Sequence, residues 1–510
     1  MRSAEGPPSP LLARAVPVAT AIVCAAFALK ALALIDRTSL WGDELRSVIK
    51  AFQPSVPFLL DYLRNDSHPP LYYLSLWGWG QLAGHTAVSL RLFSWLAYLT
   101  GGLLITVQAA GLAGRRTRAA GLAALMAFCT PFPLRFSIEG KGYALLVALV
   151  ALALLLRAAL LERRSPPFGA SLGYGLAVAL ASLTHFYGLG LMGALSFWDA
   201  TRGRWRLAGA AALGIVPCLG WILYASEYLF RSSTNSWIEA PELSLLTNTL
   251  TWAVGEEPLR KLIGLGVALL ALRLWAGRRN AMPGNGSAEA PGKRGAGVGP
   301  LLDRSGVGAG VLLVAFVVAV SFLKPIAFSR YFVVLVPVVI PPLAVLAAEW
   351  RLRPPGEWLA AVLIVVALAH FWEASFAPLD PGKGRFDRER EDFRSLSLRL
   401  ADEPWRYGRR PELLQASDRV LGTAGVLTEQ PSPWGEEAEL RRDLGRTPPP
   451  GGVVLAAAGR RSDVEDRVAE LLDISRGAGY VCRPLEDLPK GAMAWRCLPS
   501  SQVSPVPAPP

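Results

Sequence analysis

Long apolar segments recur throughout the first 373 residues, and they constrain the fold more than any other feature. A helix needs about 20 apolar residues to cross a bilayer core of ~30 Å. The sequence therefore predicts a polytopic α-helical membrane protein with about eleven transmembrane helices, although one short run leaves counts from ten to thirteen open. The runs are 14–35, 90–112, 119–135, 142–161, 168–184, 188–200, 206–225, 259–276, 306–323, 331–348 and 358–373.

Charged residues divide the chain into two regions. Only 18% of all residues are charged and 52% are apolar, whereas a typical soluble protein has about 25% charged residues. This composition excludes a disordered chain and disfavours a soluble enzyme. Residues 1–373 hold 32 basic and 19 acidic side chains, while residues 374–510 hold 20 basic and 21 acidic ones. We therefore expect a membrane body over 1–373 and a charge-balanced soluble domain over 374–510.

The soluble region shows the pattern of a small α/β domain. Helical patterns at 391–402 and 463–475 alternate with short apolar strands such as 452–458. Such a domain could recognise an acceptor, cover a lipid site or simply stabilise the protein, and the sequence leaves these alternatives open.

Arginine clusters occur in every second loop and indicate the orientation in the membrane. Cytoplasmic loops carry an excess of Lys and Arg, so we expect a multi-pass plasma membrane protein, typical of a bacterial inner membrane, with a cytoplasmic N-terminus and an extracytoplasmic C-terminal domain. The net charge of +12 is then a topology signal, and no nucleic-acid partner is expected. The clusters lie at 115–118, 163–164, 202–206, 278–304 and 351–353.

The apolar segment 71–84 requires a separate interpretation. A crossing there would place every later Arg cluster outside. The segment is short for a span, and Trp77 and Trp79 favour an interface. We predict a helix lying on the outer membrane surface within a first outer loop of residues 36–89; a short true span is the alternative.

Polar clusters occur in the predicted outer loops, all on one side of the membrane. Each has a simple structural explanation: Asp66 could cap the following helix, Glu139 and Lys141 could neutralise each other, and a lone histidine in a turn is often structural. Their convergence on one side is what indicates a functional site. The candidate residues are Asp43, Glu44, Asp66, His68, Glu139, Lys141, Tyr143, His185, Arg330 and Tyr331.

The order of these motifs resembles the GT-C membrane glycosyltransferases, in particular the group of protein mannosyltransferases, aminoarabinose transferases and RgtA/B/C/D-like enzymes related to glycosyltransferase family 39. The resemblance rests on Trp-x-Asp-Glu at 41–44, His-Pro-Pro-Leu-Tyr-Tyr at 68–73, Glu-Gly-Lys-Gly-Tyr at 139–143 and Arg-Tyr at 330–331. One departure is Lys141, where relatives often have Arg; it keeps the charge but lacks the planar fork that binds phosphate.

The resemblance implies a GT-C fold and transfer of a sugar from a polyprenyl-phosphate donor to an envelope acceptor on the outer membrane face. The acceptor could be a glycolipid, a polysaccharide or a protein, and direct displacement would invert the anomeric centre. Asp43 and Glu44 form the expected catalytic pair, with Asp43 as general base, and Lys141 and Arg330 would balance the charge of the lipid phosphate. The remaining candidates would position the substrates.

Cofactor use is left open by the sequence. Glu44, Asp66, His68 and Glu139 could help hold a divalent metal ion, but their spacing is not that of a tight ligand motif. No nucleotide-binding fold is required, because the sugar would already be activated on the lipid, and the sequence has no Gly-rich phosphate loop after a strand.

Two rival functions compete with the transferase. A transporter or flippase of lipid-linked sugars would place its charges near the middle of the membrane, whereas here they lie in outer loops. A structural scaffold would leave the ordered polar clusters without a purpose.

The five cysteines follow the same division of the chain. Cys482 and Cys497 lie in the outward domain, where we predict a disulfide. Cys24, Cys129 and Cys218 lie in the spans and should pack as small apolar residues.

Overall fold

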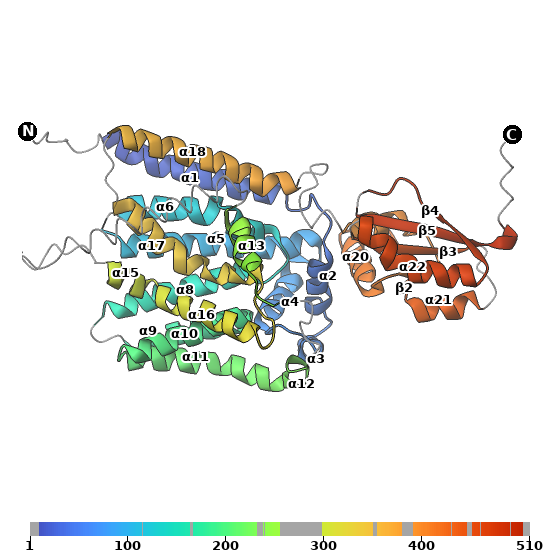
Figure 1. Cartoon of the computed structure of the whole chain (residues 1–510), viewed down its shortest axis with the longest axis horizontal. Helices are drawn as coiled ribbons and strands as arrows, with labels where there is room; N and C mark the ends of the chain where they lie inside the picture. Colours follow the sequence, from blue (N-terminus) through green and yellow to red (C-terminus); the bar gives the residue numbers. More distant parts are fainter. Residues whose placement is uncertain are drawn as a thin grey trace, which may run out of the picture.

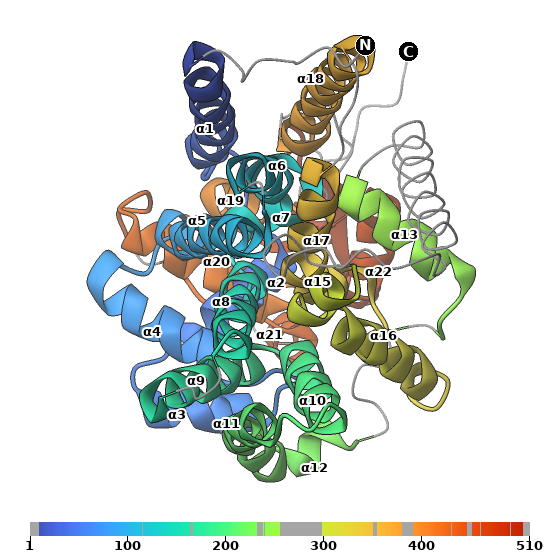
Figure 2. The same cartoon turned by 90° about the vertical axis from the view of Figure 1, so that its left-hand side faces the viewer.

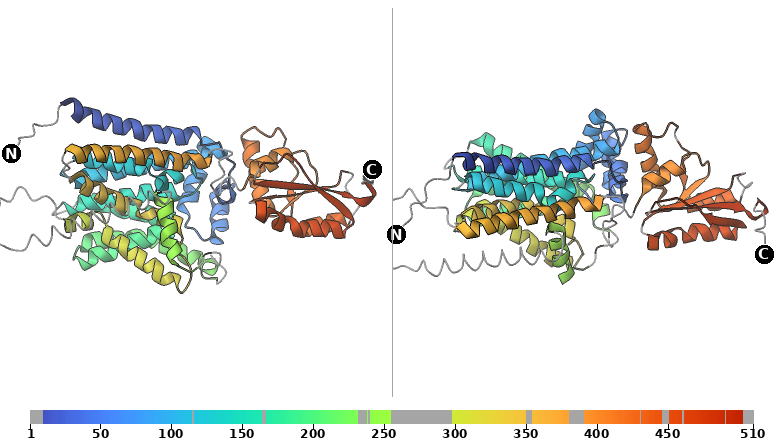
Figure 3. Two further views of the ribbon diagram at one scale, coloured as in Figure 1. Left: turned by 45° about the horizontal axis from the view of Figure 1, so that its top comes forward. Right: turned by 90° about the horizontal axis from the view of Figure 1, so that it is seen from above.

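The computed structural model shows a bundle of helices with a sheet-containing domain beyond one of its ends (Figure 1). Further views show the same separation along the long axis (Figure 3). The structure describes residues 10–114, 116–163, 167–231, 238, 240–254, 298–349, 354–379, 391–429, 431–445, 451–459, 461–489 and 491–502.

The helices of the bundle follow the apolar runs of the sequence. Seen along the bundle, α1 and α18 lie at its periphery, and α5, α8 and α17 lie near its centre (Figure 2). The bundle comprises α1 (Pro10–Ala33), α5 (Ala87–Leu112), α6 (Arg116–Cys129), α7 (Pro131–Arg135), η1 (Phe136–Ile138), α8 (Tyr143–Leu161), α9 (Phe168–Thr184), α10 (Phe186–Thr201), α11 (Trp205–Tyr224), α12 (Ser226–Leu229), α13 (Leu243–Val254), α15 (Val298–Arg304), α16 (Val307–Ser321), η2 (Ser329–Leu335), α17 (Val336–Glu349) and α18 (Pro354–Phe376), followed by η3 (Ala377–Leu379).

The predicted number of about eleven crossings is not confirmed. Among the described residues, six helical segments are long and apolar enough to cross a membrane, or up to eight if two pairs bent by 45° and 63° each form one span. Ten of the eleven predicted runs coincide with described helices. However, α9 and α10 have only 17 and 16 residues, and the run 259–276 lies outside the described residues. The chain is thus a multi-pass membrane protein, and its described residues contain fewer full-length candidate spans than the eleven predicted.

Small residues allow the bundle helices to approach closely. A Cβ atom at Gly214 of α11 would lie only 2.5 Å from the carbonyl oxygen of Gly175 in α9. A Cβ at Gly101 of α5 would lie 3.3 Å from the backbone of Ala148 in α8. Such contacts stabilise helix pairs in a membrane, where apolar burial alone gives little driving force.

The first loop folds into three short helices at the end of the bundle that faces the sheet domain (Figure 1). They are α2 (Gly42–Ala51), α3 (Val56–Arg64) and α4 (Leu71–Ala83). Pro70 directly precedes α4, and α4 buries Tyr72, Tyr73 and Leu76. The 13-residue α4 is not among the candidate spans in the described part of the chain; its position on the membrane surface stays a prediction.

The C-terminal region contains a five-stranded sheet of order β2-β1-β3-β5-β4. Strands β1, β2 and β3 pair in parallel, and β5 pairs antiparallel with β3 and β4. The predicted strand at 452–458 and helix at 463–475 are confirmed as β3 and α22. The elements are α19 (Phe393–Arg399), β1 (Arg406–Gly408), α20 (Pro411–Thr423), β2 (Trp434–Gly435), α21 (Glu437–Leu444), β3 (Val453–Ala458), α22 (Arg461–Gly477), β4 (Tyr480–Pro484), β5 (Ala492–Pro499) and η5 (Ser500–Gln502).

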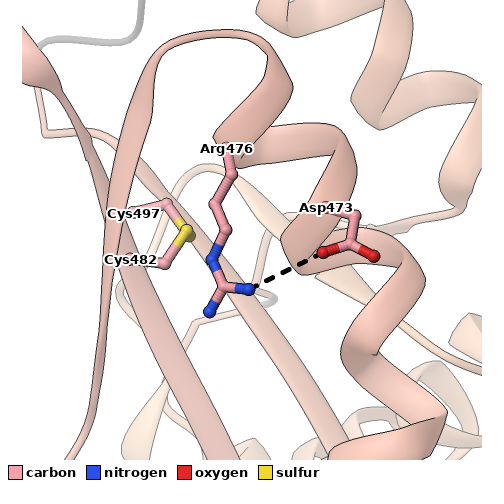
Figure 4. Close-up of a disulfide and its surroundings, with 4 residues drawn as sticks. All are labelled: Asp473, Arg476, Cys482 and Cys497. Atoms are coloured by element: carbon pink, nitrogen blue, oxygen red, sulfur yellow. Dashed lines mark ion pairs between the residues drawn. A yellow bond between two sulfur atoms is a disulfide. The ribbon is translucent and has the colours of Figure 1, made fainter.

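The predicted disulfide joins the two C-terminal strands. Cys482 of β4 and Cys497 of β5 are direct cross-strand partners, with Cα atoms 3.9 Å apart. Figure 4 shows this bond beside the surface ion pair of Arg476 and Asp473 on α22. The other three cysteines are free and buried, which confirms their expected packing role.

Candidate active site at the end of the helical bundle

Asp43 and Arg330 form the central ion pair of the site. Asp43 lies in the first turn of α2, and its Oδ2 accepts a hydrogen bond from the Arg330 guanidinium at 2.9 Å. Arg330 lies in η2, and its guanidinium also stacks on Trp41, 5.3 Å from the ring centroid, and on Phe328, at 4.8 Å. Two predicted site residues 287 positions apart are therefore in direct contact.

Lys141 supplies a second positive charge near Asp43. Its side chain is buried, and none of the carboxylates in the described chain lies within ion-pair distance of its ammonium group. Burial lowers the pKa of Lys141. Burial would also raise the pKa of Asp43, but the charges of Lys141, Arg330 and Arg46 outweigh it and lower that pKa to about 2. Asp43 is thus an ionised carboxylate facing two cations.

Asp66 and His68 form a second polar unit beside the first. The Asp66 carboxylate contacts His68 Nδ1 at 2.7 Å and the Lys50 ammonium at 2.5 Å. Burial opposes ionisation of Asp66, but Lys50 and His68 lower its pKa below its usual range. Burial lowers the pKa of His68 as well. An Asp66 acceptor at Nδ1 favours the tautomer whose Nε2 is free to accept a proton or a hydrogen bond.

Lys50 is a further candidate site residue, one that the sequence analysis did not single out. It lies seven positions after Asp43 on α2, and residues seven apart share one face of a helix. Its side chain is buried and approaches the Tyr73 hydroxyl at 3.5 Å. The i, i+7 spacing of Asp43 and Lys50 was the available signal.

Glu44 is fully buried, and its carboxylate is bound by Arg91. Arg91 donates from Nε to Glu44 Oε1 at 2.8 Å and from Nη2 to Oε2 at 2.7 Å. Glu44 Oε1 also accepts the Gly140 N–H at 2.8 Å. Through these contacts Glu44 holds α2 against α5 and against the turn that carries Lys141.

Arg91 is the other residue that the sequence reasoning missed. It lies in α5 and donates further hydrogen bonds to the carbonyl oxygens of Ile35, Thr38 and Ser39. A buried arginine inside an apolar run is costly unless it is paired, so its presence in the run 90–112 was a usable signal.

Glu139 pairs with Arg135 in the turn before α8. The Arg135 Nε lies 3.9 Å from Glu139 Oε2, so the alternative in which Glu139 simply neutralises Lys141 is not what the structure shows. The glycine at 140 permits close packing, since a Cβ there would lie 2.5 Å from Leu90.

His185, Tyr143 and Tyr331 form an aromatic group beside His68. The His185 ring centroid lies 5.0 Å from Tyr331, 6.0 Å from Tyr143 and 6.2 Å from His68. His185 Nδ1 accepts the Tyr187 N–H at 3.1 Å, which leaves Nε2 as the donor of the neutral ring. A narrow cavity next to Tyr143 is lined by His68, Tyr72, Tyr73, Lys141, Gly142, Tyr143 and Thr184.

The sequence leaves the use of a divalent metal ion open. Within the described ranges, no three His, Cys, Asp or Glu side chains are grouped as metal ligands.

The fold agrees with the class that the sequence resemblance indicated. Two crystal structures of ArnT from Cupriavidus metallidurans, an aminoarabinose transferase with the GT-C fold, superimpose on the chain. The apo structure gives a TM-score of 0.59 at 14% identity and covers 95% of this chain and 99% of ArnT. The structure bound to undecaprenyl phosphate gives a TM-score of 0.56 at 14% identity, and the match covers 93% of this chain and 97% of ArnT.

A third solved structure is less similar. The oligosaccharyltransferase AglB from Archaeoglobus fulgidus, in complex with an inhibitory peptide and a dolichol-phosphate, gives a TM-score of 0.39 at 12% identity, covering 96% of this chain and 75% of AglB. No protein-family model and no curated protein matches the sequence. The similarity to the two ArnT structures shows that the chain has the GT-C fold.

Proposed function

We propose that the protein is a membrane glycosyltransferase that moves a sugar from a polyprenyl-phosphate donor to an envelope acceptor. The observation that carries this proposal is the Asp43–Arg330 pair beside the buried Lys141, at one end of a GT-C bundle. ArnT has the same fold and was crystallised with undecaprenyl phosphate, which supports a polyprenyl-phosphate partner.

Arg330 and Lys141 are suited to bind the phosphate of the donor. The Arg330 Nε is buried and has no hydrogen-bond partner among the described residues, and a phosphate oxygen would satisfy it. As the bond between the anomeric carbon and the phosphate oxygen breaks, its electron pair stays on that oxygen. Both cations would stabilise the resulting negative charge.

Asp43 would act as the general base for the acceptor. The acceptor hydroxyl oxygen forms the new bond to the anomeric carbon, and its proton passes to the Asp43 carboxylate. A single displacement of this kind inverts the anomeric configuration. A bound phosphate would offset the two cations that lower the pKa of Asp43, so the donor itself would make Asp43 a stronger base.

The proposed reaction takes place on the extracytoplasmic side. The Arg-rich segments at 116–118 and 202–206 flank the ends of helices remote from the site, which supports a cytoplasmic location for that end. The N-terminus would then be cytoplasmic and the sheet domain extracytoplasmic. Transfer assays with a glycolipid, a polysaccharide and a protein as acceptors would identify the acceptor class.

Substitution of Asp43 tests the proposed function. In proteoliposomes supplied with polyprenyl-phosphate sugars and candidate acceptors, Asp43→Asn should lower transfer by about 10²-fold or more, the usual contribution of a general base. Asp61→Asn, at an exposed position of α3, is the matched control and should retain activity.

Other outcomes separate the rival functions. Full transfer by a folded Asp43→Asn protein would disprove the base assignment. Translocation of the lipid without sugar transfer by the wild type would support a transporter instead.

A further inference from the structure

The N-terminus of α2 is capped by a residue of the sheet domain. Helix α2 begins at Gly42, immediately before Asp43, and the first N–H groups of a helix have no partner within it. Glu391, just before α19, accepts the Gly42 N–H on its Oε2 at 2.7 Å. The two residues are 349 positions apart in the sequence, so this contact depends entirely on the docking of the sheet domain.

A second residue of the same segment holds the chain that leads into α2. The Arg394 N–H donates to Ser39 Oγ at 3.1 Å, and its guanidinium donates to the Asp36 carbonyl oxygen at 3.1 Å and pairs with the Asp36 carboxylate. On the opposite side, Arg91 binds the carbonyl oxygens of the same stretch. Residues 35–42 are therefore held between the bundle and the sheet domain.

Apolar contacts keep this arrangement in place. Leu45 and Val48 of α2 are fully buried in one cluster with Leu413 and Leu414 of α20. The same cluster contains Phe393 and Leu396 of α19. The sheet domain is thus packed on the helix that carries Asp43, and not merely linked to the bundle.

We propose that Glu391 is a positioning residue for the reaction, because it fixes the first turn of α2 and so directs the Asp43 carboxylate toward Arg330 and the acceptor. This inference rests on the proposed function of Asp43. It assigns the sheet domain a part in building the active site. Misplacement of a reacting group by about 1 Å can cost 10²-fold in rate, so a lost cap should be visible in turnover.

Gly42 provides an independent way to disturb the same contact. A Cβ atom at position 42 would lie 2.8 Å from Glu391 Oε2. The carboxylate is the far end of a flexible side chain and can move away. Gly42→Ala should therefore break the cap and leave the domain docked, since the next contact, with Leu413, is at an ordinary 3.6 Å.

The experiment compares kcat, the KM for the donor and the Kd of undecaprenyl phosphate in the full-length protein. Glu391→Ala and Gly42→Ala should each lower kcat by about tenfold or more, as expected for a misplaced base. The KM and the lipid Kd should change little, because Arg330 and Lys141 stay in place. Glu391→Gln should restore most of kcat, since its amide oxygen can still accept the Gly42 N–H.

A matched control variant shows whether the loss of kcat is specific to the Gly42–Glu391 contact. Glu470→Gln, on the exposed face of α22, should match the wild type. Unchanged kcat in both Glu391→Ala and Gly42→Ala, with an active wild type, would overturn this inference alone. If Glu391→Ala fails to fold, Gly42→Ala decides. A wild type that transfers no sugar would overturn the proposed function, and this inference with it.

Discussion

Asp43 is a poor base in the unliganded protein, and the residues around it explain why. The charges of Lys141 and Arg330 more than compensate for burial and lower its pKa to about 2. A base works best when its pKa is close to the working pH. The same cations are the groups that would bind a lipid phosphate, so donor binding and base strength are coupled through charge.

Replacement of Arg330 should shift the acid limb of the pH profile. Asp43 must be ionised to accept a proton, so kcat/KM falls as the pH drops through the pKa of Asp43 in the free enzyme. Arg330→Gln removes a cation, raises that pKa and should move the acid limb to higher pH than in the wild type. The measurement is kcat/KM against pH for both proteins.

The same measurement has a matched control. Arg64→Gln changes an exposed arginine of α3 whose Nη2 lies 3.9 Å from Glu227 Oε2. This variant should have the same acid limb as the wild type. An identical acid limb in Arg330→Gln and the wild type would contradict the electrostatic account.

At the scale of elements, one buried ion pair holds the first loop against the bundle. Glu44 of α2 and Arg91 of α5 are both almost fully buried, and the Gly140 N–H adds the turn before α8. Removing one partner of a buried pair leaves an uncompensated charge, which typically costs 3–5 kcal/mol. The pair thus positions three segments of the site together.

Arg91→Met should destabilise the protein by about 3–5 kcal/mol and abolish transfer. The double variant Arg91→Met with Glu44→Gln should recover much of the stability, because no buried charge is left alone. Thermal unfolding in detergent measures both effects. Arg231→Met, which removes an exposed i, i+4 pair with Glu227, should cost less than about 1 kcal/mol. Equal stability of Arg91→Met and the wild type would refute the account.

The sequence singles out candidate site residues but not their partners. Polar residues in short outer turns are costly, which is why Asp43, Lys141 and Arg330 stand out as candidates; their roles stay predictions. Arg135 and Glu139 pair at the i, i+4 spacing that a helical turn brings together. Arg91 and Glu44 are 47 positions apart, and no spacing rule predicts that contact.

The number of spans was the weaker prediction for a related reason. Runs of apolar residues do not distinguish a straight span from a bent pair such as α15 and α16, at 63°. The strand order of the sheet also depends on long-range pairing, whereas the strand 453–458 and the helix after it were visible as local patterns.

For the whole molecule, the two ends of the bundle carry different polar networks. Helix α8 begins just after Lys141, and Arg157 lies 14 residues into it, about 21 Å further along the axis. There Arg157 is fully buried and binds Asp199 through two hydrogen bonds of 2.8 and 2.7 Å. Arg204 and Asp303 extend this network. The donors and acceptors of this network satisfy one another, and the network joins α8, α10 and α15. At the other end, Lys141 has no ion-pair partner within the described ranges.

Cysteine labelling should reveal which end faces outward. The three cysteines of the bundle are buried, and the disulfide protects Cys482 and Cys497. In Cys497→Ser the partly exposed Cys482 becomes a free thiol. If the sheet domain is extracytoplasmic, a membrane-impermeant maleimide should label this variant in intact spheroplasts, and the wild type only after reduction.

The labelling must be read beside the stability of the domain, because a disulfide that closes a loop of about 15 residues contributes about 3 kcal/mol. Thermal unfolding of Cys497→Ser shows whether the sheet is still folded, and Cys482→Ser/Cys497→Ser corrects for background. Labelling that requires permeabilised membranes would place the sheet domain, and with it Asp43, in the cytoplasm. The donor would then have to present its sugar on the cytoplasmic side, and the proposed orientation would be wrong.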